Sequence, residues 1–306
     1  MSMKPLEIVF IGTAASVPTK ERNLSSVALK YSGDWLLFDC PEGAQRQMMS
    51  SNVSYMKIKY IFISHFHGDH FLGLPGLLAT MSMHGREDSL TIFGPRNVDE
   101  FVKKAVELSM LKVNFPIKCI QVKSGIILKD SGYAIRAVRL KHDIPCFGYV
   151  FTESDKLGEF SRKKAIELKI PEGPLWGMLQ KGETIRHDGK KINPEDVLDY
   201  SKGRRGKKVS IIFDTRPVDD YLEGIEGSDI LIHEASFTED FKERALETKH
   251  STAAEAAEVA KKSKCKKLFL FHISARHKSA EEIEAEARKV FAESFAAKDL
   301  LKIEMK

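Results

Sequence analysis

Cysteine is scarce in this 306-residue sequence, and no two cysteines have the spacing of a shared metal site. The four are far apart, form no Cys-x-x-Cys pair, and lie in or beside apolar runs; they are Cys40, Cys119, Cys146 and Cys265. This pattern favours buried free thiols over disulfides or thiolate ligands. We therefore expect a protein of a reducing, cytoplasmic compartment.

Long apolar runs are also missing. The run at Leu6–Ile11 is too short for a signal peptide or a membrane span, and no later stretch reaches the roughly 20 residues that a bilayer requires. With 42% hydrophobic and 30% charged residues, the chain is long enough for one large core or two smaller ones. We expect a globular protein without a membrane partner.

Neither sign of charge dominates, since the formal net charge is only +5, but the charge is unevenly distributed. Residues 153–208 contain fourteen Lys or Arg and ten Asp or Glu, a net charge of +4. This segment interrupts a strand-rich pattern with a Lys-rich helical stretch at about 160–168 and a hairpin signal at 187–190. We interpret 153–208 as a basic arm inserted into a single domain that spans 1–306. A solvated linker is the alternative.

Trp176 favours the arm interpretation. It lies in the segment Pro171–Gly177, which contains two prolines and two glycines and is typical of a turn. Because aromatic and arginine side chains are enriched at interfaces, we expect Trp176 to lie on a contact surface.

The most informative stretch is Ser64–His70, which reads Ser-His-Phe-His-Gly-Asp-His. It follows the apolar run Lys59–Ser64, which predicts a buried strand, and it precedes a stretch that predicts a helix. Imidazole and carboxylate are the nitrogen and oxygen ligands of zinc, and a hydrolytic zinc keeps one position open for water. Four candidate ligands in this turn therefore suggest more than one metal ion. A surface histidine-rich loop without metal is the alternative.

Residues able to bind metal also follow four later predicted strands. His142 follows the strand at 133–140, Asp214 the one at 209–213, and His272 the one at 268–271. Glu234 lies just after a further strand at 230–232. In open α/β sheets the sites form at the carboxyl ends of strands, so one shared edge carrying metal ligands accounts for all of them.

Two capping boxes predict helices near the end of the chain. Thr252 with Glu255 predicts a helix start, which places His250 just outside a helix N-terminus. Ser279 with Glu282 predicts a second helix, running to about Ala297.

The candidate ligands support hydrolysis by two zinc ions. There are seven of them: His65, His67, Asp69, His70, His142, Asp214 and His272. Two dications held close together need negative charge between them, and Asp214 is the natural bridge. Zinc lowers the pKa of its bound water to about 7, so a hydroxide nucleophile is available at neutral pH. Asp69 can orient that nucleophile or accept its proton.

The His-x-His-x-Asp-His motif, with its downstream partners, resembles the metallo-β-lactamase superfamily. Further motifs resemble ribonuclease Z, the tRNA 3′-processing endonuclease family, in its short form. These motifs are Pro18-x-Lys20-x-Arg22-Asn23, Asp214-Thr215-Arg216-Pro217, His233-Glu234-Ala235-Ser236, His250-Ser251-Thr252 and Gly173-Pro174 within the basic arm. One departure is Phe213, where the family commonly has a small residue or glycine.

The resemblance implies an α/β fold, the αβ/βα four-layer sandwich of the metallo-β-lactamases, with an inserted flexible arm. It implies two Zn²⁺ per subunit and a homodimer. It also implies removal of the 3′ trailer from precursor tRNA by attack of metal-bound hydroxide on the phosphodiester, which leaves a 3′-hydroxyl on the tRNA.

The resemblance further implies a role for each site residue. His65, His67 and His142 would hold one zinc, while Asp69, His70 and His272 would hold the other. Asp214 would bridge them, Asp69 would accept a proton, and His250 paired with Glu234 would protonate the leaving oxygen. Substrate contacts are expected from six residues, of which the last two belong to the arm that would grip the tRNA elbow: Lys20, Arg22, Ser274, Arg276, Gly173 and Pro174.

Two other functions remain open from the sequence. One is a dinuclear zinc phosphodiesterase or hydrolase of another substrate, for which the basic arm has no use. The other is an RNA-binding scaffold without metal, against which the complete ligand set argues.

Overall fold

The computed structural model describes residues 6–110, 112–130 and 132–305. The chain divides into two compact units. The first is built from the chain up to Lys129, from Ile135–Phe151 and from Lys208 onward, and the second from Asp130–Ala134 and Thr152–Lys207. Within the described part of the chain, no helix has both the length and the apolar character needed to cross a membrane.

Two seven-stranded sheets form the centre of the first unit. The first sheet has the order β18-β1-β2-β3-β4-β5-β6, with β1 (Leu6–Gly12), β2 (Ser26–Tyr31), β3 (Asp34–Phe38), β4 (Ile58–Phe62), β5 (Leu90–Gly94), β6 (Ile117–Gln121) and β18 (Lys302–Met305). The second has the order β17-β16-β15-β14-β9-β8-β7, with β7 (Gly125–Asp130), β8 (Tyr133–Leu140), β9 (Cys146–Glu153), β14 (Lys208–Ile212), β15 (Ile230–Glu234), β16 (Leu268–Phe271) and β17 (Ser294–Ala296).

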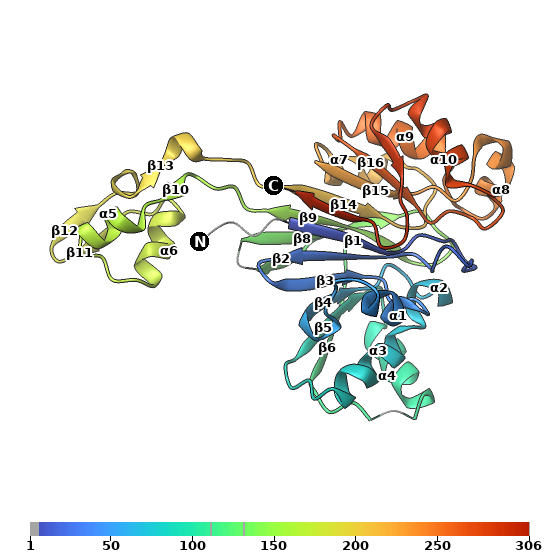
Figure 1. Cartoon of the computed structure of the whole chain (residues 1–306), viewed down its shortest axis with the longest axis horizontal. Helices are drawn as coiled ribbons and strands as arrows, with labels where there is room; N and C mark the ends of the chain where they lie inside the picture. Colours follow the sequence, from blue (N-terminus) through green and yellow to red (C-terminus); the bar gives the residue numbers. More distant parts are fainter. Residues whose placement is uncertain (1–5, 111, 131, 306) are drawn as a thin grey trace. The chain divides into compact units, whose positions relative to one another are not determined.

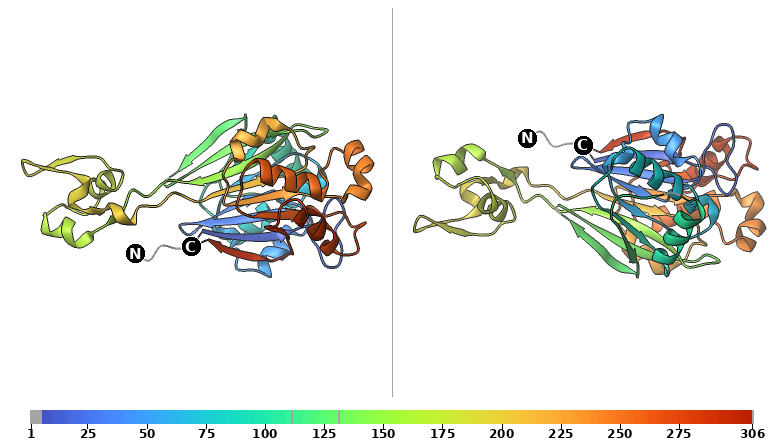
Figure 2. Two further views of the ribbon diagram at one scale, coloured as in Figure 1. Left: turned by 90° about the horizontal axis from the view of Figure 1, so that it is seen from above. Right: turned by 90° about the horizontal axis from the view of Figure 1, so that it is seen from below.

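Helices cover the outer face of each sheet (Figure 1). The first sheet carries α1 (Ala44–Met49), α2 (Gly68–Phe71), α3 (Leu74–Met83) and α4 (Val98–Leu108). The second carries α7 (Leu222–Ile225), α8 (Lys242–Glu247), α9 (Ala253–Lys262) and α10 (Ala280–Arg288). Viewed from above and below, orange-red helices lie over one outer face and blue-teal helices over the other (Figure 2). This is the four-layer αβ/βα arrangement expected from the sequence.

Apolar side chains fill the space between the two sheets. Phe38 and Phe62 of the first sheet pack on Tyr149 of the second, with ring centroids 6.0 and 5.3 Å apart. The strands β3 to β6 are parallel to one another, and so are β14 to β17. Their near-continuous apolar sequences suit parallel strands buried on both faces, and their polar residues therefore gather where the strands end.

The second capping box and the long C-terminal helix are wrong. The helix α10 ends at Arg288, and Ser294–Ala296 forms β17 beside β16. Phe295 stacks on Phe269 with ring centroids 5.3 Å apart, so sheet pairing prevails over local helix preference. The Ser279 hydroxyl accepts from the backbone of Glu281, without the reciprocal bond from Glu282. The first box, by contrast, is confirmed at Thr252 and Glu255.

The second unit has a small core of its own. It contains β10 (Glu159–Phe160), α5 (Arg162–Glu167), α6 (Pro174–Gln180), the hairpin β11 (Ile185–His187) and β12 (Lys190–Ile192), and β13 (Leu198–Asp199). Its buried apolar side chains are Ala165, Ile170, Trp176, Leu179, Ile185, Ile192 and Val197. This confirms the Lys-rich helix and the hairpin, and it identifies a folded unit rather than an extended linker.

The expectation that Trp176 lies on a contact surface is wrong. Its side chain is only 7% exposed, and its indole Nε1 donates to the backbone carbonyl of Ile170 at 3.0 Å. The segment expected to form a turn contains the start of helix α6, with Pro174 in its first turn, where a proline is favoured. Trp176 is therefore one of the buried core residues of the second unit.

Candidate metal centre

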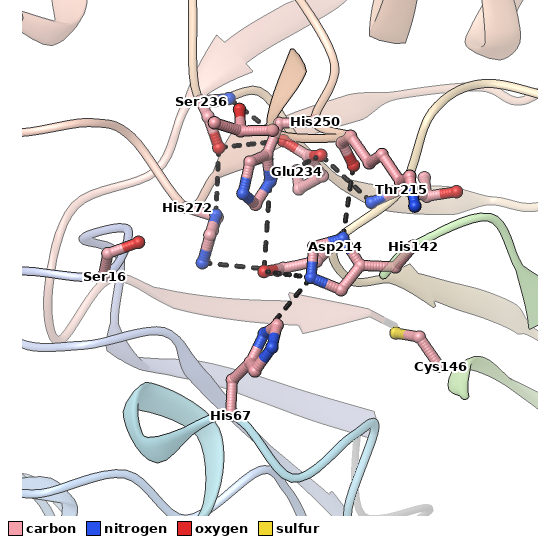
Figure 3. A network of polar contacts seen from close by, with 12 residues as sticks. Ser16, His67, His142, Cys146, Asp214, Thr215, Glu234, Ser236, His250 and His272 are labelled. Atoms are coloured by element: carbon pink, nitrogen blue, oxygen red, sulfur yellow. Dashed lines mark hydrogen bonds and ion pairs between the residues drawn. The ribbon is translucent and has the colours of Figure 1, made fainter. Parts of the chain in front are cut away.

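The seven predicted ligands come together at one edge of the two sheets. His65 and His67 follow β4, while Asp69 and His70 lie in the short helix α2. The other three come from the second sheet: His142 follows β8, Asp214 follows β14, and His272 follows β16. Figure 3 shows several of these side chains converging on Asp214.

Three histidines form a first group of possible ligands. His67 Nδ1 lies 3.1 Å from His65 Nε2 and 3.2 Å from His142 Nε2. All three ring nitrogens lie close enough to share one ion.

Asp69, His70, Asp214 and His272 form the second group. His70 Nε2 lies 3.4 Å from both Asp69 Oδ2 and Asp214 Oδ2. His272 Nε2 lies 3.2 Å from Asp214 Oδ1. Asp214 also reaches the first group, because its Oδ2 lies 3.7 Å from His65 Nε2 and 3.9 Å from His142 Nε2. Its carboxylate therefore lies between the two groups.

Three atoms at the centre of this cluster are buried without a hydrogen-bond partner among the described residues. They are His70 Nε2, Asp214 Oδ1 and His272 Nε2. Buried polar atoms nearly always have a partner, so three unpartnered atoms that face one another fit a bound cation. Imidazole nitrogen and carboxylate oxygen are also the donor atoms that zinc accepts. The residues present therefore fit a metal centre.

The protonation states of Asp69 and His65 suit this use. Burial raises the pKa of Asp69, but the neighbouring His272 and His70 rings outweigh it and hold that pKa well below its usual range. Burial lowers the pKa of His65, and the neighbouring His70 lowers it further. A charged carboxylate and a neutral imidazole are the forms that bind metal.

Asp39 is a site residue that the sequence reasoning missed. It follows β3 and is fully buried, and its Oδ2 lies 2.6 Å from His70 Nδ1. It also accepts from the backbone N–H and the hydroxyl of Ser64, at 2.6 and 2.7 Å. A carboxylate behind a ligand histidine fixes the ring orientation and leaves the other nitrogen free for metal. The available signal was its position directly after a strand, which it shares with the predicted ligands.

Hydroxyl groups hold two other histidines of the cluster. Ser236 Oγ lies 3.0 Å from His272 Nδ1, and Ser64 Oγ lies 2.9 Å from His65 Nδ1. Both contacts occupy the Nδ1 atoms, so the Nε2 atoms of His272 and His65 face Asp214, at the distances of 3.2 and 3.7 Å given above.

His250 and Glu234 lie beside the cluster, with His250 Nδ1 3.2 Å from Glu234 Oε1. The fully buried Glu234 carboxylate also accepts backbone N–H bonds from Thr215, Ser236 and Ser251, at 3.1, 3.0 and 2.8 Å. These donors occupy both of its oxygens and keep it ionised. Burial lowers the pKa of His250, but the carboxylates of Glu234 and Asp214 outweigh it and raise that pKa to about 9.

The residues predicted to bind substrate occupy different environments. Lys20 is exposed, whereas Arg22 is bound internally, with its Nη1 donating to Thr13 Oγ1 at 2.6 Å and to the Ala297 carbonyl at 2.8 Å. Ser274 and Arg276, with His250 and Ser16, line a cavity of about 420 Å³; we call it the His250 cavity. Gly173 and Pro174 are exposed at the start of α6 in the second unit.

Phe213, the residue that departs from the family pattern, is fully buried. Its ring packs edge-on against His70 and Phe271, at centroid distances of 5.9 and 5.5 Å. It therefore forms part of the apolar support behind a ligand histidine.

The fold and the ligand cluster place the chain among the metallo-β-lactamase-fold proteins. YhfI from Bacillus subtilis, a metallo-β-lactamase fold protein, superimposes with a TM-score of 0.70 over 98% of this chain and 99% of its own, at 19% identity. A family model described as anti-Pycsar protein Apyc1 matches residues 6–142, less than half of the chain.

More specific similarity covers nearly the whole length. Human tRNase Z, short form, has a TM-score of 0.71 and 28% identity over 98% of this chain and 99% of its own. A ribonuclease Z of Methanosarcina acetivorans is 41% identical over 98% of both chains. This chain belongs to the ribonuclease Z family, so the resemblance seen in the sequence motifs is confirmed.

Proposed function

We propose that this protein is a zinc-dependent endoribonuclease that removes the 3′ trailer from precursor tRNA and leaves a 3′-hydroxyl on the tRNA. The observation that carries the proposal is the convergence of seven histidine and aspartate ligands in a chain 41% identical to a ribonuclease Z over 98% of its length. The substrate, the product and the residue roles are those that the family resemblance implies, and the geometry of the cluster supports the roles.

Two zinc ions would be held by the two ligand groups. His65, His67 and His142 would hold one, and Asp69, His70 and His272 the other, with Asp214 shared between them. When bound, zinc supplies a nucleophile at neutral pH and neutralises charge on the phosphoryl oxygens.

Asp69 orients the attacking oxygen and accepts its proton. The backbone N–H of Ser16 donates to Asp69 Oδ2 at 3.1 Å, which fixes the carboxylate. Because the pKa of Asp69 is low, its carboxylate is charged at neutral pH and can orient the attacking oxygen by accepting a hydrogen bond.

His250 donates a proton to the leaving 3′-oxygen of the tRNA. Glu234 holds the ring and stabilises its protonated form, while backbone donors hold Glu234 in place. Glu234, His250 and His272 also lie close enough together to hold a metal ion. Because Glu234 Oε1 lies 3.2 Å from His250 Nδ1, we assign His250 as the proton donor and not as a ligand of the two proposed groups.

His250→Ala is expected to slow cleavage by roughly 10²- to 10⁴-fold, the usual contribution of general acid catalysis. Zinc content should stay at the wild-type value, because His250 is not one of the proposed ligands. A substrate with sulfur in place of the leaving 3′-oxygen needs no protonation and should restore most of the rate. Single-turnover rates and elemental analysis measure these effects, with the exposed His84→Ala as control. Loss of zinc in His250→Ala, or no rescue by the sulfur substrate, would contradict the acid role.

The second unit would supply sequence-independent attraction to the tRNA elbow. Five of its exposed cations lie outside the buried core: Lys163, Lys164, Arg186, Lys190 and Lys191. Contacts of this kind fix an RNA through its phosphates and 2′-hydroxyls. We also propose a homodimer in which one subunit's arm grips the tRNA cut by the other, and a cytoplasmic location that suits a tRNA substrate and four free cysteines.

The test is cleavage of a precursor tRNA by the purified zinc protein, with both new ends mapped. A single cut at the acceptor end, giving a 3′-hydroxyl, is the expected result. Hydrolysis of a small phosphodiester without any cut in precursor tRNA would instead favour the small-molecule hydrolase. Tight RNA binding without hydrolysis or zinc would favour the scaffold.

A further inference from the structure

A second cavity, of about 350 Å³, lies in the first unit close to the metal ligands. Its lining is basic and contains no acidic residue: Arg96, Gln121, Val122, Lys123, Ser124, Arg139, Pro145 and Phe147. The three cations come from separate places in the fold. Arg96 lies between β5 and α4, Lys123 lies between β6 and β7, and Arg139 lies in β8. We call this feature the basic pocket.

The cations of the basic pocket have no carboxylate partners. Within the described part of the chain, Arg96, Lys123 and Arg139 form no ion pair and no side-chain hydrogen bond. Arg139 instead stacks over the ring of Phe147, with its guanidinium carbon 5.3 Å from the centroid. Three like charges around one hollow repel each other, so an anion bound there would be stabilised.

Two carboxylates follow Arg96 in the first turn of α4. They are Asp99 and Glu100. Glu100 is paired with Lys104 at 2.7 Å, and neither carboxylate lines the basic pocket. The charge inside the pocket therefore remains uncompensated by the protein.

The basic pocket adjoins the first ligand group. The backbone N–H of Phe147 donates to the carbonyl of Ser64 at 3.1 Å, and Ser64 directly precedes His65. Arg139 precedes His142 by three residues, which span at most about 10 Å of chain. Cys146 precedes the lining residue Phe147 in β9, and its sulfur lies 3.7 Å from His65 Nδ1, so the start of this strand lies between the basic pocket and His65.

The two cavities have no lining residue in common. Ser16 lines the His250 cavity, whereas Cys146 adjoins the basic pocket. Figure 3 shows Ser16 to the left of Asp214 and Cys146 to the right. Each cavity has a lining residue next to the metal cluster: His250 lines one, and Phe147, whose N–H donates to the carbonyl of Ser64, lines the other.

We propose that the basic pocket binds a backbone phosphate of the 3′ trailer, the RNA on the far side of the cut. The inference rests on the proposed function. The leaving 3′-oxygen belongs to the tRNA and lies at His250, so the tRNA end occupies the His250 cavity. The trailer continues away from the scissile phosphate on the opposite side. Two arginines and a lysine suit a phosphate there, and Gln121 and Ser124 can bond a ribose or phosphate oxygen.

The test compares two precursors of the same tRNA, with trailers of one and of about ten nucleotides. In Lys123→Ala and Arg96→Ala, kcat/KM for the long trailer should fall roughly tenfold. The slope of log(kcat/KM) against log salt concentration should become less steep by about 0.7 for each phosphate that is no longer bound. The one-nucleotide trailer should be cut within about twofold of the wild-type rate, because it does not reach the pocket. Replacing trailer phosphates one at a time by neutral methylphosphonates should locate the linkage at which the variant effect disappears.

Matched controls remove exposed cations outside the basic pocket. Lys118→Ala, in β6, and Arg136→Ala, in β8, should leave both substrates at wild-type rates. The side chains of all four residues are exposed, so none of the substitutions should disturb folding more than the others. A difference in rate between the pocket variants and the control variants therefore reports on the pocket.

Three other outcomes would overturn the inference. Equal loss on both trailer lengths would mean that the pocket contacts the tRNA body. Unchanged rates in the pocket variants would mean that no phosphate binds there. If the wild-type protein cuts neither precursor, the proposed function itself fails, and the trailer site fails with it.

Discussion

Asp214→Ala is expected to lose most bound zinc and to lower precursor tRNA cleavage by roughly 10⁴-fold or more, the scale on which loss of an essential catalytic group acts. The physical reason is the position of its carboxylate. Its two oxygens lie 3.2 to 3.9 Å from nitrogen atoms of both ligand groups. Without this negative charge, two dications held by histidines would repel each other at close range. Elemental analysis and single-turnover cleavage measure the two effects.

Asp69→Ala is the informative comparison, because Asp69 belongs to only one ligand group. It should retain about one zinc per chain while cleavage falls to the background rate. The exposed Asp220→Ala is the control and should keep two zinc ions and the wild-type rate. If Asp214→Ala keeps two zinc ions, or if Asp69→Ala cuts as fast as wild type, the proposed division of the ligands is wrong.

The ligand set could be predicted because parallel strands place their ends at one edge. Asp214 and His272 are separated by 57 intervening positions in the chain, yet each directly follows a buried strand, and that rule brought them together. Asp39 obeys the same rule but was missed. It has no histidine beside it in the sequence, and its role depends on a contact with His70 that only the folded chain creates.

The other errors have one physical origin, which is tertiary packing. The tail after Arg288 is rich in residues compatible with a helix, but Phe295 finds a partner in Phe269 and the segment joins the sheet. Trp176 looked like a contact residue because its neighbours are glycine and proline. It is instead the largest side chain in the buried core of the second unit. Local sequence cannot report a partner supplied from elsewhere in the chain.

Replacing Leu157–Gly203 by Asn-Gly is expected to spare hydrolysis of a small phosphodiester and to reduce kcat/KM for precursor tRNA by about 100-fold or more. The join is defined by the structure. Lys156 and Arg204 exchange backbone hydrogen bonds at 2.9 and 2.8 Å, and Asn-Gly is a preferred two-residue hairpin turn between such a pair. The core removed, from Ala165 to Val197, lies wholly within the deleted segment.

The ion pair at the base of the second unit would remain in this variant. Arg204 donates to both oxygens of the buried Glu153 carboxylate, at 2.8 and 2.7 Å, and neither residue is deleted. Bis(p-nitrophenyl) phosphate should therefore be hydrolysed within about threefold of the wild-type rate, because no proposed ligand or proton donor is removed. Equal loss of both activities would show that the second unit supports the metal centre and would contradict its role as an RNA grip.

A charge variant separates RNA attraction from the mere presence of the second unit. Alanine at Lys163, Lys164, Arg186, Lys190 and Lys191 leaves the buried core intact, since all five side chains are exposed. If the unit acts by neutralising phosphates of the tRNA duplex, this variant should bind tRNA more weakly. The slope of its log(kcat/KM) against log salt concentration should also be less steep, by about 0.9 for each phosphate that is no longer neutralised. If it cuts tRNA like wild type while the deletion variant does not, recognition rests on the shape of the unit. In that case Gly173 and Pro174, exposed at the start of α6, are the next residues to replace.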